Sequence, residues 1–376
     1  MKTNSNNFLN KTKGILLGTA VGDAIGLPME GMSSKLIRRL KWMENPDTVR
    51  HHFFLGKGMW SDDTEHTIML TQALLASDGD VVKFRKSLGW ELRWWLWGLP
   101  AGVGMATARA IFKLWLGFPT TRSGVFSAGN GAAMRCAIIA AYFPDQAEKR
   151  KEFTIAQTRL THSDPKASIG AMAVTEVTAY MLQHDTLPSS EKILSILNEA
   201  SDIDLNASRG YSEAKDQWLE IIKLMEQYWS EKKATKEFLT ALYQPIKRCP
   251  KKGVTGYVYH SAPIAIYAGV LDGWDFQKVI HSIVSLGGDT DTVAAIAGAM
   301  CGAAHGTENI PSLWIKNIKE WPCSTSDLTQ LAEAVTTKSK IRVRARWSPF
   351  LIIRNIFFLI IVLLHGFSRL IPRTSQ

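Results

Sequence analysis

Two segments near opposite ends of the chain carry a glycine or an alanine at every fourth position. These residues are Gly14, Gly18, Gly22 and Gly26 in the first segment, and Ala294, Gly298, Gly302 and Gly306 in the second. On an α-helix this spacing places the small residues on one continuous stripe. Glycine costs a helix about 1 kcal/mol relative to alanine at an interior position, so such a stripe is tolerated where another backbone approaches closely. The spacing predicts two tightly packed helices at the centre of the fold.

Helix-forming segments account for most of the remaining chain. Stretches rich in Ala, Leu, Met and Ile alternate with short breaks, whereas alternating strand patterns are scarce. The clearest helical stretches span residues 64–77, 132–143, 166–183, 214–229, 261–272 and 291–304. A hydrophobic fraction of 46% is enough for a large core and excludes a disordered or fibrous chain. We therefore expect an all-α, compact single domain over residues 14–335, preceded by a polar segment (1–13) and followed by a basic, hydrophobic tail (336–376).

The positive charge of the chain is concentrated in this tail. From residue 334 onward there are eight Lys or Arg residues and no Asp or Glu, which leaves only +2 of the net charge of +10 for residues 1–333. A nucleic-acid-binding domain normally places its positive charge on the folded face that meets the phosphates. We therefore expect no nucleic-acid partner.

Cysteine usage and the first residues of the chain indicate the compartment. The four cysteines are Cys136, Cys249, Cys301 and Cys323. They are far apart and form no C-x-x-C pair, which argues against a disulfide framework and against a thiolate zinc site. The first 13 residues are polar and lack the apolar stretch of an export signal. We expect a cytoplasmic protein.

The tail contains a long apolar stretch. Residues 350–370 are mostly Leu, Ile, Phe and Val, and a helix of this length could reach across a bilayer core. A helical projection places the polar interruptions on about one side: Arg354, Asn355, His365, Ser368 and Arg369. This pattern favours a helix in the membrane interface at the cytoplasmic face, with the basic residues attracted to anionic lipid. The alternatives are a tail anchor, a helix docked on another protein, and a helix folded onto the domain.

Two short acidic motifs each precede a helical segment. Residues 61–64 are Ser-Asp-Asp-Thr, and residues 287–292 are Gly-Gly-Asp-Thr-Asp-Thr. Either motif alone is typical of a helix start, where serine caps and acids favour the positive end of the helix dipole. Together they form an oxygen-rich set without His or Cys, which suits Mg²⁺ or Mn²⁺ better than zinc. Four buried carboxylates would repel one another, so the motifs predict a site for one or two divalent cations.

These motifs belong to an ordered series that resembles the ADP-ribosylglycohydrolase family. The series consists of Gly18 to Gly26 with Glu30, Trp60 to Thr64, Gly129 to Arg135, Thr161 to Ser163, Gly256 to Val258, and Gly287 to Thr292. The resemblance covers residues 14 to about 310. It implies an all-α fold around a binuclear Mg²⁺ or Mn²⁺ centre. The implied reaction is hydrolysis of the N- or O-glycosidic bond between ADP-ribose and a protein side chain or small group.

The resemblance also implies roles for individual residues. The metal ligands would be Ser61, Asp62, Asp63, Asp289, Asp291 and Thr292. The catalytic residues would be Asp62, Asp63 and Asp289, together with Glu30 near the metals. The substrate-binding residues would be Gly129, Asn130 and Gly131 at the pyrophosphate, with His162 and Tyr257. We expect Asp23 to be structural, holding a turn or an outer contact of the site.

Two questions stay open in the sequence. Arginine-directed relatives often carry an acidic residue in the segment that here spans residues 98–104, and this chain has none there. Linkage to arginine, to serine or to another group is therefore not decided. The alternative to a hydrolase is a non-catalytic ADP-ribose-binding or partner-blocking protein on the same fold, and metal dependence would separate the two.

Overall fold

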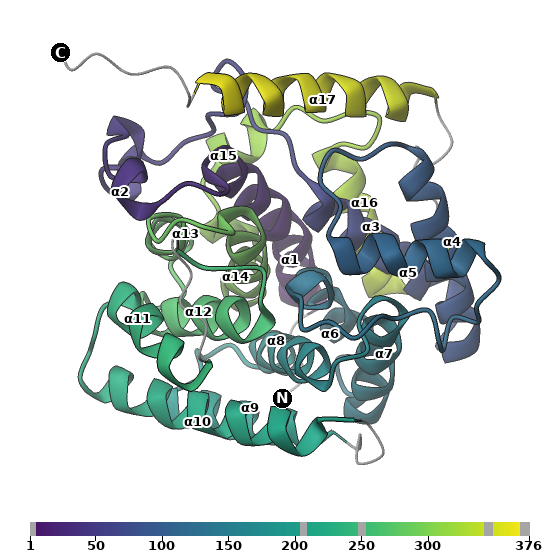
Figure 1. Ribbon diagram of the computed structural model, residues 1–376, viewed down its shortest axis with the longest axis horizontal. Coiled ribbons are helices and arrows are strands. Elements are labelled where there is room, and N and C mark those ends of the chain that lie inside the picture. Colours follow the sequence, from purple (N-terminus) through teal and green to yellow (C-terminus); the bar gives the residue numbers. More distant parts are fainter. Residues whose placement is uncertain (1–4, 204–208, 247–252, 342–348, 369–376) are drawn as a thin grey trace.

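The two small-residue segments form the central helix pair of the computed structural model, which describes residues 5–203, 209–246, 253–341 and 349–368. They are α1 (Ser5–Gly26) and α14 (Thr290–His305), and their backbones touch along the predicted stripes (Figure 1). A Cβ atom on Gly18 would lie 2.1 Å from the carbonyl oxygen of Gly298, and one on Gly302 would lie 2.0 Å from that of Gly14. The prediction of close backbone packing at the centre is confirmed.

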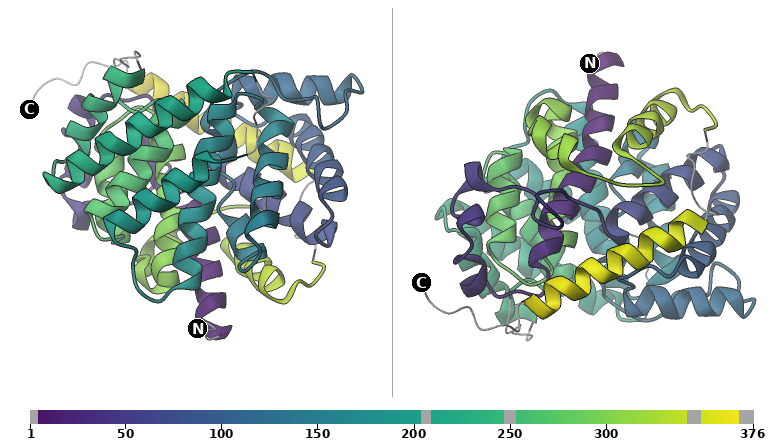
Figure 2. Two further views of the ribbon diagram at one scale, coloured as in Figure 1. Left: turned by 90° about the horizontal axis from the view of Figure 1, so that it is seen from below. Right: turned by 90° about the horizontal axis from the view of Figure 1, so that it is seen from above.

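Further helices surround this pair on all sides in Figure 1 and in both views of Figure 2. Three of them, α3 (Asp62–Ser77), α8 (Pro165–Gln183) and α12 (Val258–Leu271), are largely buried. The others are α2 (Ser34–Ile37), α4 (Val81–Trp97), α5 (Met105–Trp115), α6 (Ile138–Tyr142), α7 (Ala147–Thr161), α9 (Ser190–Ser201), α10 (Tyr211–Ser230), α11 (Thr235–Ile246), α13 (Phe276–Val284), α15 (Ser312–Asn317), α16 (Thr325–Thr337) and α17 (Pro349–Ser368). Short 3₁₀ helices occupy Leu27–Met29, Lys41–Met43, Pro46–Thr48, Asn130–Ala132 and Gly306–Asn309. Within the described ranges there is no β-strand, only isolated bridges, so the all-α prediction is confirmed.

Two predicted boundaries differ from the structure. The stretch 132–143 forms an α-helix only at Ile138–Tyr142, because the chain before it makes a 3₁₀ turn at Asn130–Ala132 and further turns. At the other end, α1 begins within the polar segment 1–13. The ammonium group of Lys11 explains this extension, because it is buried and donates to the carbonyl oxygens of Met181 (2.8 Å) and His184 (2.7 Å) at the end of α8.

The described cysteines are unpaired thiols. Cys136 and Cys301 are buried and Cys323 is half-buried. Burial raises the pKa of the Cys136 thiol to about 12, so it stays protonated and unreactive at neutral pH. Cys249 lies outside the described residues.

The apolar stretch of the tail forms α17, which lies across the outside of the domain (Figure 2, right). Its inward face includes the polar residues Arg354 and Asn355 together with Phe358 and Ile361, all buried against the body of the protein. Its outward face is apolar and exposed: Phe350, Ile352, Ile353, Ile356, Phe357, Leu359, Ile360, Leu363, Leu364 and Phe367. Among the alternatives for the tail, the structure shows the one in which the helix folds onto the domain. Arg369 lies outside the described residues.

In the described part of the chain, none of the helices is both long enough and apolar enough to cross a bilayer.

Candidate metal and substrate site

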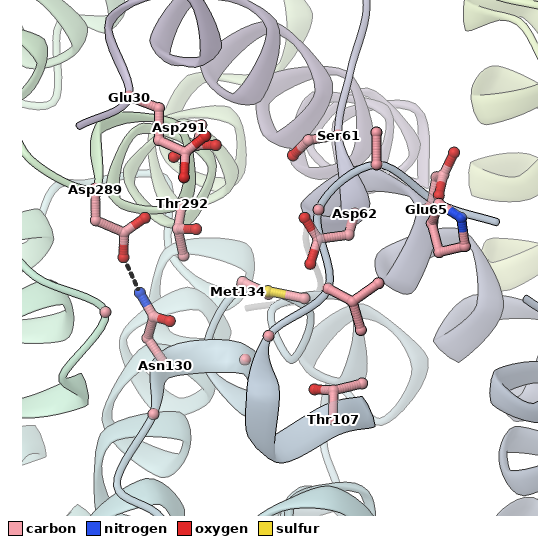
Figure 3. Close-up of a pocket in the computed structure, with 18 of the residues that line it drawn as sticks. Glu30, Ser61, Asp62, Glu65, Thr107, Asn130, Met134, Asp289, Asp291 and Thr292 are labelled. Atoms are coloured by element: carbon pink, nitrogen blue, oxygen red, sulfur yellow. Dashed lines mark hydrogen bonds between the residues drawn. The ribbon is translucent and has the colours of Figure 1, made fainter. Parts of the chain in front are cut away.

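Both acidic motifs open into one cavity of about 530 Å³. The first turn of α3 contributes Ser61 and Asp62, and the start of α14 contributes Asp289, Asp291 and Thr292. Figure 3 shows Ser61 and Asp62 on one side of the cavity, with the α14 residues and Glu30 facing them. Motifs more than 220 residues apart in the sequence are therefore adjacent in the fold.

The first motif is held in place by Asp23 of α1. This fully buried carboxylate accepts hydrogen bonds from the backbone N–H of Ser61 (2.9 Å), from the N–H of Thr64 (3.1 Å) and from the Thr64 hydroxyl (2.6 Å). Burial raises the pKa of Asp23 to about 6, while these hydrogen bonds oppose the rise. Asp23 fixes the start of α3 and does not line the cavity, as expected for a structural residue.

The second motif depends on two glycines in left-handed conformations. Gly287 (φ 74°) and Gly288 (φ 87°) turn the chain into α14, and a Cβ atom on Gly288 would lie 1.9 Å from the carbonyl oxygen of Val254. Left-handed conformations strongly favour glycine. The turn lets Asp289 reach Asn130, whose side-chain amide donates to its Oδ2 at 2.7 Å.

A hydroxyl joins the two motifs. Thr292 donates to Oδ2 of Asp63 at 3.3 Å, and Ser61 donates to the same oxygen at 3.1 Å. Asp63 is not among the residues that line the cavity, and it lies buried where the first motif meets the second. The six predicted metal ligands are therefore gathered in one place.

The carboxylates of the site fit a divalent cation. Oδ1 of Asp63 and Oδ1 of Asp291 are buried and have no hydrogen-bond partner. Burial, and then the neighbouring carboxylates, raise the pKa values of Asp62, Asp63 and Asp291 well above their usual range. A cation bound here would relieve both the desolvation and the repulsion.

The arrangement of these ligands is not that of a complete all-carboxylate cage. In the part of the chain that the structure describes, no group of three or more His, Cys, Asp or Glu side chains is placed to hold a metal ion. The candidate set here mixes carboxylates with the hydroxyls of Ser61 and Thr292. Mg²⁺ commonly uses few carboxylates and keeps several waters.

The predicted substrate residues are only partly brought to the cavity. Gly129, Asn130, Gly131 and His162 line it, whereas Tyr257 does not. The ring of Tyr257 instead contacts those of neighbouring α12 residues.

The glycines of this loop make room for a histidine. A Cβ atom on either Gly129 or Gly131 would come within 3.0 Å of the His162 ring. The backbone N–H groups of Gly129 and Asn130 donate within the protein, to the Ser127 hydroxyl and to the carbonyl oxygen of Gly256. These two N–H groups therefore already have acceptors within the protein. Burial, and then Arg135, lower the pKa of His162 to about 3, so the ring is neutral at pH 7.

Sequence reasoning missed two parts of the cavity. The first is the N-terminus of α5, where Gly104 to Thr107 line the wall and the cap residue Gly104 offers no side chain. The first N–H groups of a helix have no partner within the helix and favour anions. The second is the wall formed by Glu65 of α3 and by Arg354, Phe358 and Val362 of α17. One indication of this second part was present in the sequence, because Arg354 is a charged residue within the apolar stretch 350–370.

Comparisons with known proteins place the chain in a family. Residues 4–344 match the family model described as ADP-ribosylglycohydrolase. An uncharacterised protein of Archaeoglobus fulgidus is 29% identical over 312 residues, which cover 82% of this chain and 92% of that protein. The ADP-ribosyl-[dinitrogen reductase] glycohydrolase of Rhodospirillum rubrum is 25% identical over 312 residues, which cover 82% of this chain and 90% of that enzyme. A solved chain of an ADP-ribosylglycohydrolase-related protein complex shares the fold, with a TM-score of 0.60 and 23% identity over 89% of this chain and 99% of that one.

Proposed function

Because the chain belongs to the ADP-ribosylglycohydrolase family, we propose that it is a metal-dependent hydrolase that releases ADP-ribose from modified protein side chains. The observation that carries the proposal is the meeting of the two acidic motifs in one cavity, joined by the hydrogen bond from Thr292 to Asp63. The name of the Rhodospirillum rubrum relative describes removal of ADP-ribose from a protein, which supports the same reaction class here.

The cofactor in this proposal is one or two Mg²⁺ or Mn²⁺ ions. Their ligands would be Ser61, Asp62, Asp63, Asp289, Asp291 and Thr292. When bound, such ions orient a sugar and its attacking water and lower the pKa of that water. Glycosidic cleavage passes through an oxocarbenium-like state, which the carboxylates of this cavity would stabilise. Glu30 lines the cavity on the same side as Asp291 (Figure 3) and would accept the proton of the water.

The diphosphate of the substrate would lie at the N-terminus of α5. There Met105 to Thr107 line the cavity, and Thr107 lies beside Gly131. This end of the cavity contains Asn130 and the neutral His162, so it offers polar groups without adding negative charge. A helix N-terminus favours phosphate oxygens through both hydrogen bonds and the helix dipole.

The test is release of free ADP-ribose from arginine-linked and serine-linked ADP-ribosylated proteins with Mg²⁺, Mn²⁺ or EDTA. We expect release with metal, none with EDTA, and none from an Asp289→Ala variant. Glu308→Gln, at an exposed position after α14, is the control and should retain wild-type activity. If the wild type binds ADP-ribose in calorimetry but releases none from either protein or from small ADP-ribose derivatives, the hydrolase proposal is abandoned. The non-catalytic binding protein then replaces it.

We propose in addition that the outward face of α17 contacts the cytoplasmic surface of a membrane. The support for this is the exposed apolar face together with the excess of basic residues after residue 334. Ile356→Glu and Leu364→Glu should each reduce co-sedimentation of the full chain with phosphatidylserine-containing vesicles. Leu187→Glu, at an exposed apolar residue between α8 and α9, should not. Equal sedimentation of all four proteins would refute the membrane contact.

A further inference from the structure

We propose that α17 forms the wall of the cavity at the leaving-group end, and that this wall selects ADP-ribose linked to a compact, uncharged group such as a side-chain hydroxyl. A guanidinium-linked ADP-ribose would be disfavoured. This inference rests on the proposed hydrolase function and names the substrate class of the same site. The helix lies beyond residue 344, where the match to the family model ends.

The inner face of α17 is part of the cavity and not a distant attachment. Phe358 is 4% exposed and packs with Leu27, Phe53 and Met59, while Val362 one turn later is 36% exposed. Both residues line the cavity, together with Arg354 one turn earlier. Positions 354, 358 and 362 share one helix face, so the helix presents a continuous surface to the site.

Arg354 fixes the helix in this place. Its guanidinium donates to Glu320 through Nε (3.1 Å) and Nη2 (2.6 Å), to the carbonyl oxygen of Trp60 (2.7 Å) and to the Asn355 side chain (3.0 Å). It also forms an ion pair with Glu65 at 3.1 Å. Burial by itself lowers the pKa of Arg354, but the two glutamates raise it above its usual value, so it is charged. With its donors directed to these four residues, Arg354 is a positioning residue.

The same helix also contacts the chain that leads into another part of the cavity wall. The side-chain amide of Asn355 donates to the carbonyl oxygen of Gly98 at 2.6 Å, at the end of α4. The segment that follows, from Pro100 to Gly104, lines the cavity. α17 therefore lines the cavity itself and also holds the start of a second lining segment.

The carboxylate at this end of the cavity already has an ion-pair partner and a hydrogen-bond donor. Glu65 is the carboxylate of the wall, and each of its oxygens has a partner: Oε1 pairs with Arg354, and Oε2 accepts from the indole N–H of Trp95 at 2.6 Å. A guanidinium entering here would compete with Arg354 for a partner that is already occupied. The other lining groups, Leu27, Phe358 and Val362, are apolar.

The position of the scissile bond follows from the order of groups along the cavity. The diphosphate suits the end that holds the N-terminus of α5 and Asn130, and the ribose suits the acidic motifs between the two ends. In Figure 3, Glu65 lies on the far side of Asp62 from Asn130 and Asp289. What remains for the leaving group is the end closed by α17.

The test compares kcat/KM for serine-linked and arginine-linked ADP-ribosyl peptides of the same length. We expect the wild type to prefer the serine-linked peptide by about tenfold or more, the range that a pocket wall commonly supplies. Val362→Ala and Phe358→Ala should each reduce this preference severalfold by improving kcat/KM for the arginine-linked peptide. Phe357→Ala changes an exposed ring of the same helix that does not line the cavity, so it should leave the preference unchanged.

A second readout separates this inference from the proposed function. If no peptide is cleaved, calorimetric dissociation constants of the two peptides in EDTA replace kcat/KM, and the same preference and the same shifts are expected. Val362→Ala keeps the test informative if Phe358→Ala does not fold, because Val362 is partly exposed. A wild type that prefers the arginine-linked peptide, or preferences that are identical in Val362→Ala and the wild type, would overturn the proposal.

Discussion

Substituting alanine for Gly18 is expected to prevent this protein from folding. The new methyl carbon would lie 2.1 Å from the carbonyl oxygen of Gly298 and 2.8 Å from its carbonyl carbon. Neither backbone can move alone, because α1 and α14 touch again one turn away in both directions, at Gly14 and at Gly22. The helices would have to separate along their length. We expect a loss of at least about 4 kcal/mol, a large part of the stability of a typical domain.

The measurement is the thermal unfolding midpoint, followed by circular dichroism, together with the soluble yield. Gly104→Ala is the matched control, because its Cβ atom would have Thr107 Oγ1 at 3.9 Å as its nearest neighbour. The backbone of Gly104 (φ −57°, ψ 131°) is one that alanine adopts readily. The control should unfold within a few degrees of the wild type. A Gly18→Ala protein as stable as this control would show that α1 and α14 can separate enough to accommodate a methyl group.

Changing Asp63 to asparagine is expected to stabilise the metal-free protein and at the same time to inactivate it. The carboxylate is buried, its Oδ1 has no partner, and burial with neighbouring acids raises its pKa. The repulsion between these buried carboxylates opposes folding. Removing one charge should therefore raise the free energy of unfolding by about 1 kcal/mol in EDTA. The same change removes one of the candidate metal ligands. We expect ADP-ribose release to fall roughly a thousandfold.

Melting curves with and without cation check both parts of this prediction. Mg²⁺ or Mn²⁺ should raise the unfolding temperature of the wild type, since a ligand that binds only the native state stabilises it by mass action. In Asp63→Asn the midpoint in EDTA should be higher than that of the wild type, and the rise with cation should be much smaller. Glu308→Gln should respond to cation as the wild type does. An Asp63→Asn protein that still gains full stability from the cation would place the metal elsewhere.

The sequence was sufficient for those features that are written in local spacing. The four-residue repeat from Gly14 to Gly26 predicted a close helix contact, which the structure places against α14. The acidic motifs at residues 61–64 and 287–292 predicted helix starts, and both were found. Such features need no knowledge of distant partners, because a stripe or a cap is defined within one or two helical turns.

The features that were missed depend on contacts between distant segments. The polar residues of α17 were expected to lie in a membrane interface, but the buried Glu320 and Glu65 bind Arg354 and turn this face inward. Nothing in the spacing of the tail encodes those partners. Likewise, only the fold shows which acceptors the N–H groups of Gly129 and Asn130 meet.

The contact between α1 and α14 also determines when this protein can fold. Gly26 and Thr290, which are hydrogen-bonded in the finished protein, lie 264 positions apart. At ordinary translation rates α1 leaves the ribosome on the order of 10 to 50 s before its partner is made. A glycine-rich helix gains little stability by itself, so this first helix has no lasting structure during that interval. This helix, synthesised long before its partner, is thus among the last to reach its final place, and closure of this long loop should limit the folding rate.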